Sequence, residues 1–265
     1  RYLYFSSVSA YDRSDGDLCR DEDAPLVEAL GELENPTVDN YAARKTACEA
    51  LVRAAFPGNH LILRPGLIAG PFDDTDRFSY WAVRCQQSSA AGLMLAPGAP
   101  SDPVQVIDVR DVAYFALHSQ FCGVLNLVGS TTMGQLLAAC SPIDRPVWVN
   151  WPFLEERQLR PWADLPAWIP PQKAQGFCRF SNQRALSAGL LLRPLSETAR
   201  DPAAWDMLVH RDPGTFEIKP ALATDWKFAE DNNFLDVLAD EEGVFKILAD
   251  RDGNAIDEDK QPTYW

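Results

Sequence analysis

The sequence has few histidines, little positive charge and no long apolar run. Its 265 residues contain 24 lysines and arginines against 38 aspartates and glutamates, which gives a formal net charge of -14 at pH 7. Nucleic acids and anionic membrane surfaces are bound through basic patches, so this balance argues against both partners. No apolar segment is long enough to span a bilayer, and no basic-then-apolar leader opens the sequence. We therefore expect a cytoplasmic protein with no membrane or nucleic-acid partner.

The sequence also offers few residues that could form a metal site or disulfide bonds. There are three histidines, and the six cysteines are scattered without a CxxC pair. Three disulfides are arithmetically possible, but reduced and mostly buried thiols are favoured in a cytosolic enzyme. The sequence predicts neither a metal site nor a histidine-based catalytic triad.

An alternation of apolar strands and polar helices runs through the first half of the sequence. Residues 2–5 and 60–63 are strand-like apolar runs, and a helix is predicted between them over 41–56. Strand, helix and strand in this order form a βαβ unit, which indicates an α/β fold with a parallel sheet. One face of the helix is expected to pack through small side chains: Ala42, Thr46, Ala47, Ala50, Leu51 and Ala54. Further strands are expected at 104–107 and 124–128. Further helices are expected over 109–119 and over 181–189, and a third runs to Cys140 after the capping run 130–132.

The composition divides the chain into three parts. The resemblance to a known family that the motifs below carry implies that residues 1–128 form the C-terminal half of a doubly wound, Rossmann-like domain, with 72–103 contributing to a substrate lobe. Residues 129–206 are rich in tryptophan and proline and would form most of that lobe. Their tryptophans could line a flat apolar ligand or form the core of a small domain. Residues 207–265 form an acidic extension, in which Asp252-Gly253-Asn254 favours a β-hairpin turn over a calcium loop.

The strongest chemical signal is a tyrosine and a lysine at helical spacing. Tyr41 and Lys45 are four residues apart, so the predicted helix places both side chains on one face. A nearby ammonium favours phenolate and lowers the pKa of a tyrosine toward the range of an acid–base catalyst. Alone, this pattern is common in helices. Its context adds weight, because Ser7 follows the strand at 2–5, at the sheet edge where ligands of parallel α/β sheets bind. Ser7 could equally cap the turn that follows.

In this order, the motifs resemble those of the extended short-chain dehydrogenase/reductase family, which comprises NAD(P)-dependent epimerases, dehydratases and reductases. The resemblance covers residues 1–206. It rests on Ser6-Ser7 with Tyr11, the acidic-proline loop Glu22-Asp23-Ala24-Pro25-Leu26, Tyr41 to Lys45 followed by Glu49, the run Arg64-Pro65 to Gly70-Pro71, and the segment Val106 to Ala113.

The resemblance implies roles for individual residues. Tyr41 would be the acid–base catalyst, Lys45 would lower its pKa and hold the nicotinamide ribose, and Ser7 would orient the substrate oxygen. Pro65 and Leu67 would line the nicotinamide of NAD or NADP. Candidates for binding a small-molecule substrate are Ser7, Arg77, Tyr80 and Arg179.

The sequence departs from the family at the glycine-rich turn. The GxxGxxG motif that holds the pyrophosphate at a helix N-terminus does not occur in it. We therefore expect a second polypeptide to carry the dinucleotide-binding half and to cover the strand at 2–5, unless this chain is a fragment. The expected activity is an NAD(P)-dependent interconversion of an alcohol and a carbonyl. A nucleotide-sugar epimerase or dehydratase, and a non-catalytic subunit that keeps the fold, are the alternatives.

Overall fold

The computed structural model describes residues 1–13, 20–30, 37, 40–71, 73, 77–82, 84–85, 94–140, 146–174 and 176–199. It also describes the backbone of two strands at 234–239 and 245–250. The predicted turn at residues 252–254 lies outside these residues.

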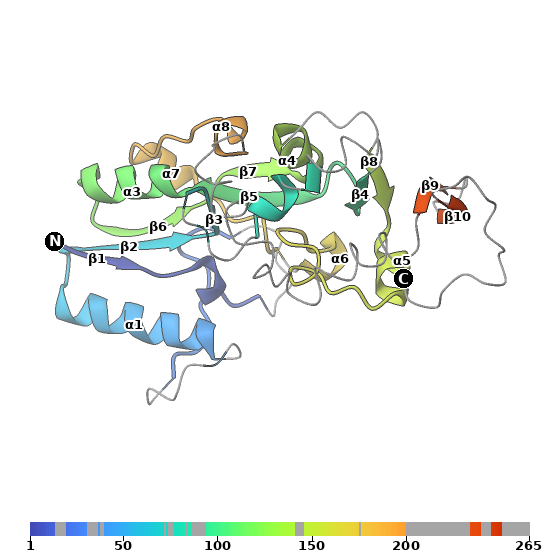
Figure 1. Cartoon of the computed structure of the whole chain (residues 1–265). Helices are drawn as coiled ribbons and strands as arrows, with labels where there is room; N and C mark the ends of the chain where they lie inside the picture. Colours follow the sequence, from blue (N-terminus) through green and yellow to red (C-terminus); the bar gives the residue numbers. More distant parts are fainter. Residues whose placement is uncertain are drawn as a thin grey trace, which may run out of the picture.

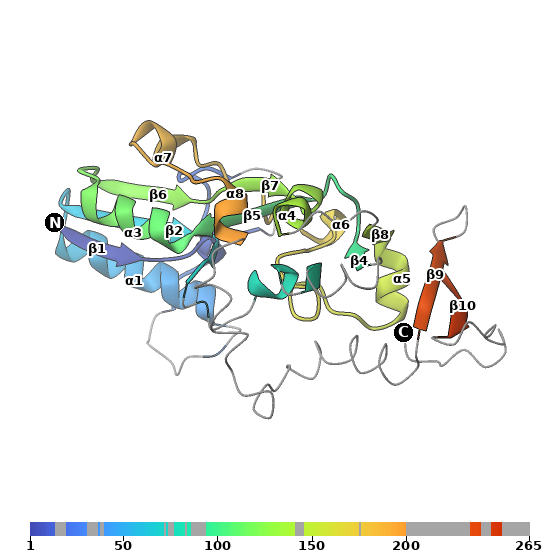
Figure 2. The same ribbon diagram turned by 45° about the horizontal axis from the view of Figure 1, so that its top comes forward.

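A parallel three-stranded sheet forms one end of the described chain. Its order is β1 (Tyr2–Phe5), β2 (His60–Pro65), β6 (Gly123–Leu127). The helices α1 (Tyr41–Ala55) and α3 (Val109–His118) lie on opposite faces of this sheet, as Figures 1 and 2 show. Alternate residues of β2 serve the two faces: Ile62 packs with Val52 of α1, whereas Leu61 and Leu63 pack with the residues of α3. The predicted α/β fold with a parallel sheet is confirmed.

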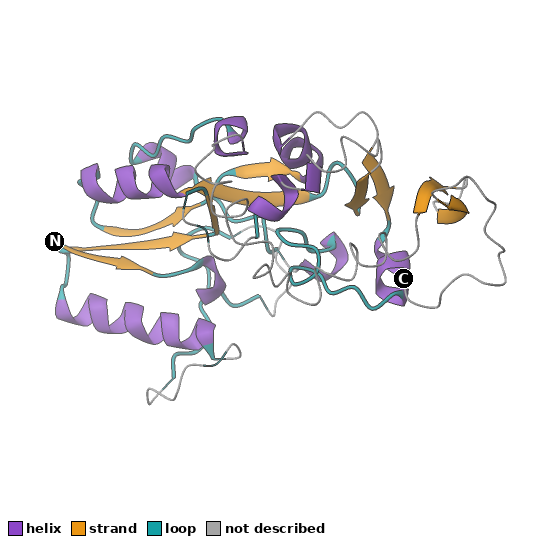
Figure 3. Ribbon diagram, in the orientation of Figure 1, coloured by secondary structure: helices purple, strands orange, loops and turns teal. Residues whose placement is uncertain are grey.

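The remaining strands are short. β3 (Leu67–Ala69) pairs in parallel with β5 (Pro103–Asp108), which pairs antiparallel with β7 (Ser130–Thr132). β4 (Met94–Pro97) and β8 (Pro146–Val149) form a separate parallel pair. Short helices complete the described part (Figure 3): the 3-10 helix η1 (Val8–Ala10), α4 (Met133–Cys140), α5 (Trp151–Glu156), α6 (Pro171–Ala174), α7 (Gln183–Ser187) and α8 (Leu195–Ala199).

The largest core cluster lies beside these shorter strands and is built around two tryptophans. Trp81 and Trp168 are fully buried. The Trp168 indole donates a hydrogen bond of 2.8 Å to Asp102, and the Trp81 indole donates one of 2.7 Å to the carbonyl of Pro166. A buried indole needs such a partner. For these two tryptophans the structure therefore supports a core role. Trp148, Trp151 and Trp162 are only partly buried against the same cluster.

The predicted small-residue stripe on the helix over 41–56 is only partly correct. Ala47 is buried, but Ala50, Leu51 and Ala54 are exposed. The face that packs on the sheet instead includes Val52 and the carboxylate of Glu49. A charged residue on a packing face was not expected, and its partner is described below.

The acidic extension contains a β-hairpin at a different place from the predicted turn. β10 (Phe245–Asp250) pairs antiparallel with β9 (Phe234–Ala239). β10 is thus the second strand of a hairpin whose first strand the sequence pattern did not predict.

The described residues contain no helix long and apolar enough to cross a membrane. They also contain no group of three or more histidine, cysteine or carboxylate side chains placed to hold a metal ion. Five cysteines lie in the described part, and no disulfide joins any two of them: Cys48, Cys85, Cys122, Cys140 and Cys178.

Candidate active site

Lys45 connects α1 with the carboxyl end of β1. Its Nζ donates a hydrogen bond of 2.8 Å to the backbone carbonyl of Phe5, the last residue of β1. The same Nζ lies 5.7 Å from the centre of the Tyr41 ring and 5.3 Å from that of Tyr4. The ammonium therefore sits between the tyrosine one helical turn away and the strand end that leads to Ser7. Tyr41 is 45% exposed, so its phenol is open to a ligand.

Ser7 follows directly after β1 and caps the short helix η1. Its Oγ accepts a hydrogen bond of 3.1 Å from the backbone N–H of Ser9. This is the capping role that the sequence left open. The hydroxyl keeps its own proton for a second bond, because it only accepts from Ser9. Its role toward a substrate stays a prediction.

Pro65 and Leu67, the predicted nicotinamide contacts, lie at the carboxyl end of β2 and the start of β3. Both are buried. Gly66 between them packs tightly, since a Cβ at that position would lie 2.9 Å from a methyl carbon of Val128. The backbone here thus lies close to the residues that follow β6.

Three of the candidates for substrate binding, Arg77, Tyr80 and Arg179, have different surroundings. Tyr80 is buried in the large core and contacts Trp81 edge-on at 4.8 Å. Arg77 is exposed and lies over the ring of Trp162 at 5.8 Å. Arg179 is exposed. Within the described residues, no contact joins these three to Tyr41 or Lys45.

A buried ion pair anchors the helix that carries Tyr41 and Lys45. Arg64 at the end of β2 donates from Nε to Glu49 Oε1 at 2.8 Å and from Nη2 to Oε2 at 2.6 Å, and both side chains are 1% exposed. Burial alone would raise the pKa of Glu49, but the hydrogen bonds and charge of Arg64 outweigh it and lower that pKa. Both residues belong to the family-like motifs, but their pairing could not be predicted from positions 15 residues apart in the sequence.

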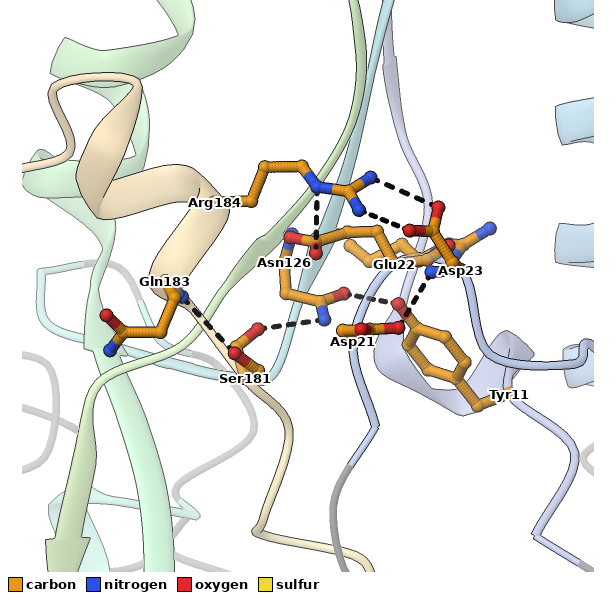
Figure 4. A network of polar contacts seen from close by, with 9 residues as sticks. Tyr11, Asp21, Glu22, Asp23, Asn126, Ser181, Gln183 and Arg184 are labelled. Atoms are coloured by element: carbon orange, nitrogen blue, oxygen red, sulfur yellow. Dashed lines mark hydrogen bonds and ion pairs between the residues drawn. The ribbon is translucent and has the colours of Figure 1, made fainter.

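A second polar network extends from this pair (Figure 4). Tyr11 lies under the Arg64 guanidinium at 4.7 Å and donates a hydrogen bond of 2.7 Å to the side chain of Asn126 in β6. The backbone N–H of Asn126 donates to Glu22 at 2.9 Å, and Arg184 of α7 forms an ion pair with Glu22 at 3.4 Å. The acidic-proline loop is thereby held between the sheet and α7. None of these contacts was predicted.

Comparisons with known proteins identify the fold of this chain. No protein-family model matches the sequence, and no curated protein matches it either. Among solved structures, gox2253 is 20% identical, with 79% of this chain and 66% of that chain covered and a TM-score of 0.51. UDP-N-acetylglucosamine 4-epimerase from Methanobrevibacter ruminantium M1 is 16% identical, with 78% and 63% covered and a TM-score of 0.50. The fold is Rossmann-like.

A third match is UDP-glucuronic acid 4-epimerase from Bacillus cereus in complex with NAD, 13% identical, with 79% and 62% covered and a TM-score of 0.48. The chain thus spans less than two thirds of the length of each of these three structures. At such identities the likeness shows the fold alone.

Proposed function

We propose that Tyr41, Lys45 and Ser7 form the acid–base centre of an NAD(P)-dependent oxidoreductase that interconverts an alcohol and a carbonyl on a small substrate. The observation that carries this proposal is the bond from Lys45 to the carbonyl of Phe5. It brings a catalytic-type tyrosine–lysine pair to the strand end that leads directly to Ser7, at the edge of a parallel sheet where ligands bind.

The role proposed for each of the three groups follows from its position. The exposed phenol of Tyr41 would give or take the hydroxyl proton of the substrate. The Lys45 ammonium faces the Tyr41 ring and would stabilise negative charge that develops on the phenol oxygen. The Ser7 hydroxyl would donate to the substrate oxygen while it accepts from Ser9.

The described residues fit one end of a nicotinamide dinucleotide. When bound, the nicotinamide would exchange a hydride with the substrate carbon. Lys45 of α1 binds the end of β1, Pro65 ends the neighbouring strand β2, and Leu67 follows it at the start of β3; the ring and its ribose would be held there. The pyrophosphate end has no such site: the sequence contains no GxxGxxG turn, and its glycines offer no equivalent.

We therefore propose that a second polypeptide supplies the pyrophosphate-binding half by docking beside β1. Among the described strands, β1 pairs only with β2, and we call its other side, along which no described strand pairs, the open edge. Tyr2 and Phe5 on this edge strand are 43% and 42% exposed. An open edge with large apolar side chains invites the addition of another strand.

A nucleotide-sugar epimerase is the second candidate, favoured by the fold shared with the Methanobrevibacter enzyme. An epimerase regenerates its cofactor in each turnover, whereas an oxidoreductase changes it stoichiometrically. The absorbance of reduced nicotinamide, followed through one substrate equivalent, separates the two. A non-catalytic subunit would convert no substrate and would leave this absorbance unchanged.

Substitution of Tyr41 tests the catalytic proposal. With the assembled protein, Tyr41→Phe should lower kcat by about a hundredfold or more, because it removes a positioned general acid–base. Tyr114→Phe is the matched control, since Tyr114 is an exposed tyrosine on the opposite helix α3. A Tyr41→Phe protein with the turnover of the control would rule the assignment out.

A further inference from the structure

Two arginines and two touching aromatic rings form a cluster outside the proposed catalytic centre. The rings of Trp162 and Phe177 meet edge-on, with centres 5.0 Å apart. The Arg13 guanidinium lies 5.0 Å above the centre of Phe177, and the Arg77 guanidinium lies 5.8 Å from that of Trp162. Guanidinium groups stacked on ring faces are partly desolvated while their N–H edges stay available as donors.

The rings of Trp162 and Phe177, here called the ring platform, are fixed by their packing and by backbone hydrogen bonds. Phe177 contacts Phe180 edge-on at 5.9 Å, and Phe180 stacks on Tyr11 at 5.4 Å, which leads to the buried Arg64 pair. The backbone N–H of Trp162 donates to the carbonyls of Leu165 and Trp168 at 3.2 and 3.0 Å. The two N–H contacts and the packed rings fix where the platform lies.

The backbone at the platform is strained. Trp162 has a φ of 66°, and Cys178, next to Phe177, has a φ of 67°. Such left-handed conformations cost free energy in residues other than glycine and persist only where the surrounding structure enforces them. They are often found at ligand-binding sites.

Within the described residues, the two arginines of the cluster differ from several others in their ion pairing. In the described part of the chain, no carboxylate pairs with Arg13 or Arg77, whereas other arginines do have acidic partners: Arg110, Arg160, Arg184 and Arg193. Arg13 is partly buried, and burial followed by repulsion from Arg20 lowers the pKa of its guanidinium. An anion that pairs with the partly buried Arg13 would offset the cost of its burial and its repulsion from Arg20.

We propose that Arg13, Arg77, Trp162 and Phe177 form a binding site for a small molecule that carries an oxyanion beside an apolar or aromatic body. The guanidinium edges bind the oxyanion, a carboxylate or a phosphate, through charge-assisted hydrogen bonds. The half-buried rings receive the apolar part. Arg13 lies on the same segment as Ser7 and Tyr11, and the Tyr11 ring stacks on Phe180, which contacts Phe177. That this ligand is the substrate rests on the proposed function, but the binding itself does not.

Isothermal titration at low ionic strength tests the site with phenyl phosphate and benzoate, and phenol serves as the uncharged analogue. We expect one of the two anions to bind more tightly than phenol and than inorganic phosphate, and their order identifies the preferred oxyanion. Arg13→Gln and Arg77→Gln should each weaken that binding about tenfold or more, since a hydrogen bond to a charged group contributes about 1.5–3 kcal/mol. Trp162→Leu should weaken it about threefold.

Arg53→Gln is the control, because Arg53 lies on α1 and its removal changes the net charge equally. Its affinity should stay within about twofold of the unsubstituted protein. The proposal is overturned if no probe binds, if phenol binds as well as the anions, or if Arg53→Gln weakens binding as much as Arg13→Gln. Tyr41→Phe should bind the anions normally, so loss of turnover in that variant and loss of binding here report on separate proposals.

Discussion

At the scale of single residues, the pairing of Glu49 with Arg64 decides where the tyrosine and lysine lie. Glu49 is one helical turn beyond Lys45 on α1, and Arg64 is the next-to-last residue of the strand β2. Their two short hydrogen bonds tie helix to sheet next to the carbonyl that Lys45 binds. The placement of the proposed catalytic pair therefore depends on a buried charge pair as well as on apolar packing.

Breaking one side of this pair should be costly. Glu49→Gln leaves the Arg64 charge buried without its counter-charge, so we expect the free energy of unfolding to fall by about 3 kcal/mol or more. The single variants Glu49→Met and Arg64→Met should each lose stability in the same way, and the double variant, which removes both charges, should recover part of that loss. Urea unfolding of the single and double variants measures the coupling. Simple additivity of the two single substitutions would contradict it.

The same pair predicts a pH dependence of stability. Because the folded protein lowers the pKa of Glu49, its unfolded state binds protons more readily at this carboxylate. The stability from this group is complete above the unfolded pKa, about 4.3, and is lost as the pH falls through the lower folded value. The free energy of unfolding, measured between about pH 6 and pH 3, should therefore fall less steeply in Glu49→Gln. Equal slopes for the two proteins would count against this assignment.

At the scale of elements, the open edge of β1 is the feature with the clearest consequence. The backbone N–H of Tyr2 donates to the carbonyl of Asn59, just before β2, and that of Ser6 donates to the carbonyl of Leu63 in β2. Because successive residues of a strand point to opposite sides, the N–H of Leu3 points to the open edge. A proline at Leu3 would remove this donor without removing a hydrogen bond to β2.

Leu3→Pro should therefore leave the isolated chain folded and abolish docking of the second polypeptide. Leu3→Ala is the matched control, since it removes the same packing and keeps the N–H. Co-purification or ultracentrifugation of the native assembly measures the docking. If Leu3→Pro assembles as well as Leu3→Ala, or if β1 is already paired with a preceding segment of the same polypeptide, the two-chain proposal is wrong.

At the scale of the whole molecule, the acidic extension is predicted to act apart from the chemistry. β9 and β10 pair only with each other among the described strands. Deletion of residues 207–265 should change the assembly or its thermal stability and leave kcat within about threefold. Size-exclusion chromatography and turnover of the truncated protein test this. Loss of turnover in a truncated protein that still assembles would contradict it.

The sequence by itself determined the elements that have a strong local pattern. Tyr2–Phe5, the helix after Asn40, the strand around residues 60–63 and the helix after Asp108 follow from apolar periodicity and capping, which act over one or two turns of chain. The four-residue spacing of Tyr41 and Lys45 likewise depends only on helical geometry. Strands of three residues, such as β3 and β7, carry too little pattern to be predicted.

Only the tertiary structure decided how distant segments combine. It pairs Arg64 with Glu49, brings Lys45 to the carbonyl of Phe5 and stacks Arg13 on Phe177. These contacts join residues that no local period relates, because each depends on the packing of whole helices and strands against one another. The same packing buries Tyr80, which was predicted to contact the substrate. It also leaves the outer edge of β1 without a partner among the described strands. Periodicity specifies which face of an element is apolar, and only the packed fold specifies what that face meets.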